Sequence, residues 1–370
     1  MTAAAPRHWF QRFLLPGFAF KAVVIGGGYA TGREIAEFFL PAGPWGGLLA
    51  MALATLAWSG IAALTFAFAQ ATGARDYRSF FQALLGRFWV AFDIAYAVFV
   101  VLILAVFGAA AGAIGQATLG LPLIAGTLAL MLGITACVAF GNRGVERVFA
   151  WVSILLYAVY AIFFVLALTQ FSSRIGTTFA SAGPPEPGWL AGGITYAAYN
   201  VVAAVVILPV TRHFTSRRDA VIAGAVAGPL AMLPALLFFL CMAAFSAEVA
   251  NAALPSDYLL VRLGSQPFHL LFQLMIFAAL LESGSGAVHA INERIADATA
   301  QPLSPVRRAL IAFVLLGFCM LLADRFGLVA LIASGYRLLA WTLLAVFVVP
   351  LLLIAPARLF RIRKAVPEAA

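Results

Sequence analysis

The sequence predicts an all-α membrane protein of about ten transmembrane helices, on the evidence of its composition, its apolar runs and its basic residues. Of the 370 residues, 64% are hydrophobic and 10% are charged, whereas soluble domains contain about 45–50% and roughly 25%. A bilayer solvates apolar side chains, and each helical span takes about 20 residues. The composition therefore excludes an ordinary soluble fold and leaves room for roughly ten spans.

Ten apolar runs follow one another along the chain, separated by short segments rich in proline, glycine and charge. We expect the spans at roughly 17–40, 45–71, 88–117, 121–141, 146–171, 189–211, 219–246, 267–296, 306–323 and 326–357. The chain is therefore interpreted as one transmembrane domain over residues 1–370.

The distribution of basic residues gives the orientation. With ten spans and a cytoplasmic N-terminus, 18 Lys and Arg fall in cytoplasmic segments and 3 in outer segments, as the positive-inside rule requires. Both termini are therefore expected to be cytoplasmic, and the formal charge of +9 indicates membrane topology and not nucleic-acid binding. The cytoplasmic set is Arg7, Arg12, Lys21, Arg75, Arg78, Arg87, Arg143, Arg147, Arg212, Arg217, Arg218, Arg294, Arg307, Arg308, Arg358, Arg361, Arg363 and Lys364, and the outer set is Arg174, Arg262 and Arg325.

Five spans leave the chain on the outer side, so the next five enter the membrane from the opposite direction. The halves, about 17–171 and about 189–357, are therefore expected to be inverted repeats. In transporters of this architecture the substrate site lies near mid-membrane, between discontinuous helices. We predict that helices one and six are interrupted.

Consecutive glycines in the first span predict where helix one breaks. Each disfavours helix by about 1 kcal/mol relative to Ala, and unpaired backbone groups at membrane depth must line a cavity or lie inside protein. Unwinding of residues 26–29 would let carbonyls hold a cation, and the amides beyond them would attract a carboxylate. Close helix packing through small residues is the alternative. The candidate residues are Gly26, Gly27, Gly28, Tyr29 and Thr31.

Charged residues follow these glycines directly. Arg33 lies roughly 12 Å below the outer interface by helix rise, a depth at which ionisable groups face a pathway or a partner. Glu34 is expected either to contact the ligand or coupling ion, or to stabilise the outer half-helix from its first turn. In span six, Tyr196, Tyr199 and Asn200 lie near the middle and form the expected facing wall.

Span eight is the second concentration of polar residues. Glu282, Ser285 and His289 recur on one helical face, with Glu282 near the centre of the span. Glu282 is expected to bind sodium with the hydroxyl of Ser283 or Ser285, or to carry a coupling proton. His289 either relays protons or packs as a neutral side chain. Arg337 in span ten is the fourth deep charge, so two arginines, Arg33 and Arg337, face two glutamates, Glu34 and Glu282. Equal numbers of opposite charges indicate two ion pairs, and the sequence does not show which arginine pairs with which glutamate.

Two motifs resemble a known family. IGGGYATGREIAEFF in the first span and LLESGSGAVHAINERI in the eighth are similar to the YkvI-type family of bacterial inner-membrane proteins, over most of the chain. That family resembles the amino acid–polyamine–organocation superfamily, which has the LeuT-type five-plus-five inverted fold. The resemblance implies a location in the bacterial inner membrane. It also implies that helices one and six unwind at the substrate site and that helices one and eight flank a cation site.

Carried over to this chain, the resemblance implies that residues 26–29 line the substrate and cation sites and that Tyr196, Tyr199 and Asn200 face them. Gly26, Ser283 and Ser285 would be the sodium ligands, with Glu282 beside them. The usual adjacent pair of hydroxyl residues in helix eight is replaced here by Glu-Ser-Gly-Ser, and helix five lacks the lysine that serves some members as a surrogate cation.

We therefore expect a secondary active transporter that moves a small amino acid, amine or related zwitterion by alternating access, coupled to a proton or sodium. Its expected partners are the small-molecule substrate and the lipid bilayer, with no cofactor beyond the coupling ion. A membrane sensor or receptor that binds a solute without moving it is the alternative. An intramembrane enzyme is disfavoured, because no nucleophile–base pair or metal-ligand set has usable spacing.

Overall fold

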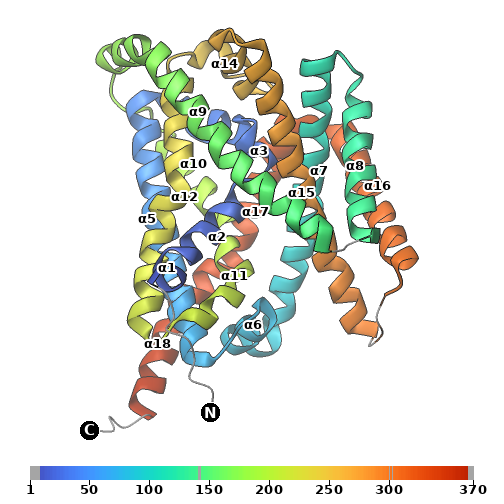
Figure 1. Ribbon diagram of the computed structural model, residues 1–370. Helices are drawn as coiled ribbons and strands as arrows, with labels where there is room; N and C mark the ends of the chain where they lie inside the picture. Colours follow the sequence, from blue (N-terminus) through green and yellow to red (C-terminus); the bar gives the residue numbers. More distant parts are fainter. Residues whose placement is uncertain (1–8, 141–142, 300, 302, 366–370) are drawn as a thin grey trace.

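The computed structural model describes residues 9–140, 143–299, 301 and 303–365, with the side chains of residues 140, 143–154, 297, 298 and 363–365 left out. Its long helices pack along one axis, with α14 at the upper end and α18 at the lower end (Figure 1); we call these the α14 end and the α18 end. The long helices are α5 (Gly43–Thr72), α7 (Trp89–Leu119), α8 (Leu123–Phe140), α9 (Arg143–Ser181), α12 (Arg217–Ala243), α15 (Gln266–Thr299) and α16 (Pro305–Ala330). No strand occurs in the described ranges, which confirms the all-α prediction.

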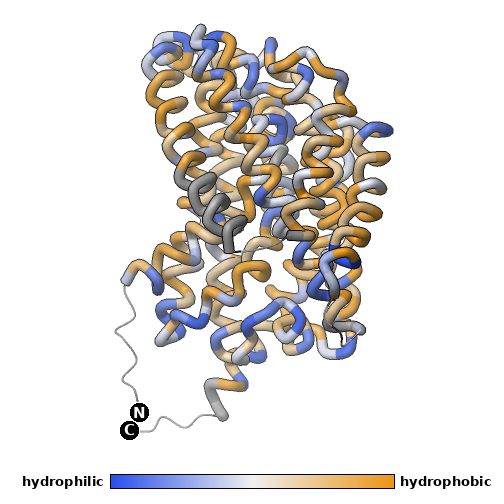
Figure 2. The backbone as a smooth tube through the Cα atoms, turned by 45° about the vertical axis from the view of Figure 1, so that its right-hand side comes forward, coloured by the Kyte–Doolittle hydropathy of each residue, from blue (hydrophilic) through white to orange (hydrophobic). Residues whose placement is uncertain are grey.

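Seven helical stretches of the described residues are long and apolar enough to cross a membrane. One of them, Pro305–Ile362, contains a break at Gly327, where φ is 72° and ψ is 166°, and therefore holds two spans. Leu123–Ala139 is a shorter apolar helix, and the first span is divided into short pieces. With these included, the described chain contains the ten segments predicted. Hydrophobic residues dominate the middle of the bundle and hydrophilic residues gather at its two ends (Figure 2).

Helix one is interrupted twice. Helix α2 (Leu15–Val24) ends at Ile25, which has a φ of −75° and a ψ of 83°. A single turn, α3 (Gly27–Ala30), follows, and Gly32 then adopts a left-handed φ of 79° before α4 (Arg33–Phe38). The predicted interruption is confirmed, but the expected unwinding of residues 26–29 is wrong in detail. The non-helical backbone lies on both sides of a helical turn, because each break needs only one or two residues.

Helix six is distorted less strongly. Helix α10 (Trp189–Asn200) and helix α11 (Ala203–Val206) are separated by Val201 and Val202, whose φ and ψ remain in the right-handed helical region. A 3₁₀ turn, η3 (Leu208–His213), completes the span. The break falls directly after Asn200, whose side-chain amide donates to the Tyr196 carbonyl at 3.1 Å. Asn200 therefore satisfies the backbone at the end of its own helix.

Several short helices were not predicted, because they do not form long apolar runs in the sequence. Helix α6 (Tyr77–Leu85) precedes the third span and begins at Asp76, whose carboxylate accepts from the Ser79 amide at 2.9 Å. Helices α13 (Ser246–Val249) and α14 (Pro255–Leu263) lie between spans seven and eight. Helix α9 continues ten residues beyond its predicted end at residue 171. The other short elements are α1 (Trp9–Phe13), η1 (Leu40–Ala42), η2 (Gly86–Phe88), η4 (Leu331–Tyr336), α17 (Arg337–Leu343), η5 (Leu344–Val348) and α18 (Val349–Ala365).

Helices α5 and α12, the second and seventh spans, make the most extensive helix–helix contact in the described part of the chain. A Cβ placed at Gly224 would overlap the backbone of Ala63, and one at Gly228 would lie 2.5 Å from the Thr55 carbonyl oxygen. Ser59 Oγ crosses the contact and donates to the Ala225 carbonyl at 2.8 Å. Small residues that allow backbones to approach are the usual basis of helix association in membranes. This pair therefore forms a rigid support for the interrupted helices one and six.

Candidate functional site

Glu34 folds back onto the broken part of helix one. Its Oε2 accepts a hydrogen bond from the Tyr199 hydroxyl of helix six at 2.6 Å. The backbone amide of Tyr29 is directed toward the same carboxylate. A Cβ placed at Gly28 would lie 3.0 Å from Glu34 Cδ and closer still to Oε1. The absence of a side chain at Gly28 is therefore what lets the carboxylate rest on the backbone, and only 3% of Glu34 is exposed.

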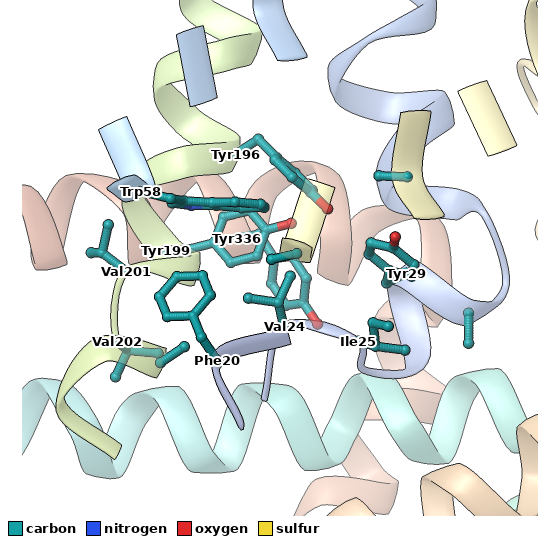
Figure 3. Packing of buried hydrophobic residues seen from close by; sticks show 14 of the residues in the cluster. Phe20, Val24, Ile25, Tyr29, Trp58, Tyr196, Tyr199, Val201, Val202 and Tyr336 are labelled. Atoms are coloured by element: carbon teal, nitrogen blue, oxygen red, sulfur yellow. The ribbon is translucent and has the colours of Figure 1, made fainter. Parts of the chain in front are cut away.

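Aromatic rings gather beside this carboxylate, and Figure 3 shows Trp58, Tyr196, Tyr199 and Tyr336 close together. The Tyr199 ring lies 4.6 Å from the ring of Tyr336 in span ten and 5.7 Å from Tyr196, measured between centroids. Tyr196 in turn lies 5.3 Å from Trp58 of α5, and all four rings are buried. The Tyr196 hydroxyl is buried without a hydrogen-bond partner among the described residues. The structure thus brings together the predicted residues Glu34, Tyr196 and Tyr199 and adds two rings that the sequence did not single out.

Arg33 points away from this cluster toward the α14 end. Its guanidinium donates to the carbonyls of Ala250 and Ala252, at 2.5 and 3.1 Å, and to Glu37 at 2.8 Å. Arg337 approaches the same Glu37, with 3.8 Å between Nη2 and Oε1, and its side chain is 59% exposed. The expected pairing of these arginines with Glu34 and Glu282 is therefore wrong. Glu37, one turn beyond Arg33 on the same face of α4, is closer to both guanidinium groups.

Thr31 holds the second break of helix one in place. Its hydroxyl donates to the Gly28 carbonyl at 3.0 Å, and its own carbonyl accepts from the Ser256 amide at 2.9 Å. Pro255 and Ser256 also pack directly against Gly32. The outer part of helix one is thus fastened to the start of α14, so Thr31 has a structural role in this conformation.

A cavity of about 930 Å³ lies on the other side of the break. It extends from Ile25 and Phe107 to Leu303 and Pro305, in the connection between α15 and α16 that lies toward the α18 end (Figure 1). Residues of α2, α7, α8, α9 and α15 form its walls. The cavity thus leads from one end of the bundle to the unwound part of helix one, whereas the Tyr29 side of the break is closed by buried rings.

The polar face of span eight lines this cavity. Glu282, Ser285 and His289, which helical periodicity placed on one face, are all on its wall, and so is Ser283. Ser285 is 5% exposed and its hydroxyl has no hydrogen-bond partner in the described part of the chain. The His289 side chain is 56% exposed and lies 4.0 Å from Glu293. The stripe therefore runs from a buried hydroxyl at mid-depth to an exposed imidazole near the α18 end.

Gly26 is separated from this stripe by an aromatic ring. A Cβ at Gly26 would lie 3.2 Å from Phe107, and a Cβ at Gly284 would lie 3.7 Å from the same ring. Phe107 of α7 therefore packs between helices one and eight, at the level where the resemblance implied sodium ligands. Nothing in the sequence marked this phenylalanine, because it lies in a uniformly apolar run.

Lys21 lies inside the protein, so its assignment to a cytoplasmic segment was wrong. It is 9% exposed, and its ammonium group lies 4.1 Å from the centre of the Tyr157 ring in a cation–π contact. Tyr157 lines the cavity with Glu282. Of the other basic residues counted for the orientation, the side chains of Arg7, Arg143, Arg147, Arg363 and Lys364 lie outside the described residues.

An interrupted first helix, ten spans and a cavity that ends at the interruption define the LeuT-type fold of secondary transporters. MhsT in complex with L-phenylalanine has this fold, with a TM-score of 0.60 and 16% identity, covering 96% of this chain and 98% of that chain. A mutant of the Eremococcus coleocola manganese transporter has a TM-score of 0.61 and 14% identity, covering 94% of this chain and 81% of that one. The predicted fold class is confirmed.

Among curated proteins, the chain is similar to the uncharacterized membrane protein YkvI of Bacillus subtilis (strain 168). The two are 25% identical over 332 residues, which is 89% of this chain and 92% of the relative. The resemblance to YkvI-type membrane proteins is therefore confirmed over most of the sequence. No protein-family model matches the chain. It is a multi-pass membrane protein with a transporter fold.

Proposed function

We propose that this protein is a secondary active transporter that carries a small organic solute by alternating access. The observation that supports this most directly is the cavity of about 930 Å³ that ends at the break in helix one. A cavity open toward one end and closed toward the other by buried rings is what one half of an alternating-access cycle requires. We place the open end and both termini on the cytoplasmic side, and the positive-inside distribution supports this orientation.

The solute we propose is an amino acid, an amine or a related zwitterion. A small organic solute of this kind fits a cavity of about 930 Å³. Beyond the break, Glu34 offers a carboxyl group and the tyrosines offer hydroxyls and ring faces. MhsT, which shares the fold, is described in complex with L-phenylalanine. The described residues contain no group of three or more His, Cys, Asp or Glu placed to hold a metal ion.

Coupling to a cation is proposed for the polar face of span eight. Glu282 is a carboxylate on the wall of the cavity, and the buried Ser285 hydroxyl nearby can supply an oxygen ligand. Sodium and protons both suit such a group, since a carboxylate binds either. His289, at the exposed end of the stripe, is placed to pass protons to water.

Uptake by purified protein in proteoliposomes tests both parts of the proposal. We expect wild-type protein to accumulate a solute from a panel of amino acids and amines, driven by an imposed sodium or proton gradient. Glu282→Gln should lower gradient-driven uptake at least roughly tenfold, because the amide cannot carry the coupling charge. The matched control is Glu186→Gln, an exposed loop carboxylate.

Three outcomes are distinguishable. Equal gradient-driven uptake by the wild type and Glu282→Gln rejects the coupling role and leaves transport intact. Binding of a solute without any uptake, in the absence of other proteins, favours the sensor or receptor. Single-channel currents far above carrier rates would identify a channel instead.

A further inference from the structure

Helix one provides its own carboxylate at the break. In the LeuT-type arrangement expected from the sequence, the free amides of this break would attract a carboxylate of the solute. Here the carboxylate of Glu34 already lies over Gly28, six residues earlier in the chain, and beside the Tyr29 amide. A solute carboxylate would therefore have to displace Glu34 and would meet it as a second acidic group.

Both oxygens of Glu34 face donors or backbone. Oε2 accepts from the Tyr199 hydroxyl, and Oε1 rests over Gly28 beside the Tyr29 amide. A tyrosine hydroxyl can donate to a carboxylate or accept from a carboxylic acid, so this contact suits either form of Glu34. Burial without a countercharge opposes the ionised form, and an ammonium group placed beside Glu34 would favour it.

The described residues offer this charge no cationic partner. The guanidinium of Arg33 is committed to Glu37 and two loop carbonyls, Arg337 also approaches Glu37, and Lys21 lies over the Tyr157 ring in the cavity wall. An ionised group inside a membrane protein normally faces a partner of opposite charge or the substrate pathway. Since no side chain supplies the positive charge, the solute is the candidate to supply it.

The aromatic rings around Glu34 suit an ammonium group on the solute. Phenol and indole faces attract ammonium groups through their π systems, and rings arranged around a cation form the usual site for alkylammonium ligands. Tyr199 and Tyr336 are 4.6 Å apart, Tyr196 and Trp58 lie beside them, and the Tyr196 hydroxyl is unpartnered within the described chain. The cavity reaches Ile25, three residues before Gly28, whereas Glu34 and its rings are buried and do not line it. A solute in the cavity therefore lies next to helix one at its break, and it reaches the rings when the buried cluster opens.

We infer that the transported solute is an organic ammonium compound without a free carboxylate, and that its ammonium group pairs with Glu34 among these rings. This inference rests on the proposed transport function and narrows its substrate class from amino acids and amines to amines.

Matched ligand triplets test the inference with wild-type protein in detergent. Each triplet contains an amine, the amino acid with the same side chain and the acid that lacks the amine: phenethylamine, phenylalanine and phenylpropionate, then isopentylamine, leucine and methylvalerate. Thermal shifts across a concentration series give the apparent affinities. We expect an amine to bind at least roughly tenfold more tightly than its amino acid, and the acids to give no shift.

Variants then locate the binding. Glu34→Gln keeps the size of the side chain and should abolish the shift with amines, Glu34→Asp should retain a weaker shift, and Glu186→Gln should match the wild type. An amino acid that binds as tightly as its amine overturns the inference, as does an amine that binds Glu34→Gln undiminished or an absence of amine binding. The order in which wild-type protein binds the amine, the amino acid and the acid tests the inference even if Glu34→Gln does not fold.

Uptake of the same compounds separates this inference from the transport proposal. Uptake of an amino acid without uptake of amines leaves the transporter standing and rejects the ammonium solute. Amine binding that depends on Glu34, with no uptake into proteoliposomes, supports the binding site and rejects transport.

Discussion

Replacing Gly28 with Ala tests whether Glu34 rests on helix one as described. The new Cβ would lie 3.0 Å from Glu34 Cδ and closer to Oε1, so the carboxylate must shift and its hydrogen bond with Tyr199 is lost. Losing a hydrogen bond to a charged group costs about 1.5–3 kcal/mol. Gly28 has no positive φ, so Ala fits the backbone and gains up to about 1 kcal/mol of helix propensity. The net expectation is a loss of about 0.5–2 kcal/mol in unfolding free energy.

A double-mutant cycle measures this effect directly. The unfolding free energies of the wild type, Gly28→Ala, Glu34→Ala and the double variant are compared in one detergent. Without the Glu34 side chain there is nothing to displace, so Gly28→Ala should be neutral or stabilising, and the coupling energy should be about 1.5–3 kcal/mol.

The matched control is Gly60→Ala in α5, where an added Cβ meets nothing within 4 Å. It should be neutral or stabilising in both backgrounds. The reasoning is refuted if Gly28→Ala changes stability by the same amount with and without the Glu34 side chain.

Two further predictions concern packing and access. Gly224→Ala should lower the unfolding free energy by about 1–3 kcal/mol through overpacking, because the new Cβ would overlap the backbone of Ala63. An unchanged melting temperature would contradict the close contact between α5 and α12. Cys137 lines the cavity and Cys241 is fully buried, so maleimide should modify Cys137 roughly tenfold faster, as read by mass spectrometry of the folded protein. Equal rates would show that the cavity is closed to reagents.

Local features of the sequence were sufficient to predict the spans and the break in helix one. Apolar runs set where helices cross a membrane, and consecutive glycines disfavour helix wherever they occur. Gly327, which divides the last two spans, falls within three residues of the predicted gap. Helix α6 was missed because its nine residues are too few for an apolar run, although Asp76 carries a recognisable N-cap signal.

Partners that come from distant parts of the chain were not predictable in the same way. Arg33 finds its acceptors 217 and 219 residues away, in the loop before α14, and so turns away from the carboxylate next to it in sequence. Phe107 enters the space between helices one and eight only because of how α7 packs. The stripe on span eight was predictable because helical periodicity alone places its members on one face.

The break in helix one and the position of Glu34 have a single cause. In a continuous helix Glu34 would lie about 7.5 Å along the axis from Tyr29, beyond reach of its amide. The interruption at Ile25 places Tyr29 in the first turn of α3, where amides lack helical partners, and the left-handed Gly32 redirects the chain so that Glu34 lies over Gly28 beside that amide. An anionic solute must undo this arrangement before it binds. A cationic solute leaves it in place and supplies the positive charge that the described chain does not place beside Glu34, which is the basis of the inferred ammonium substrate.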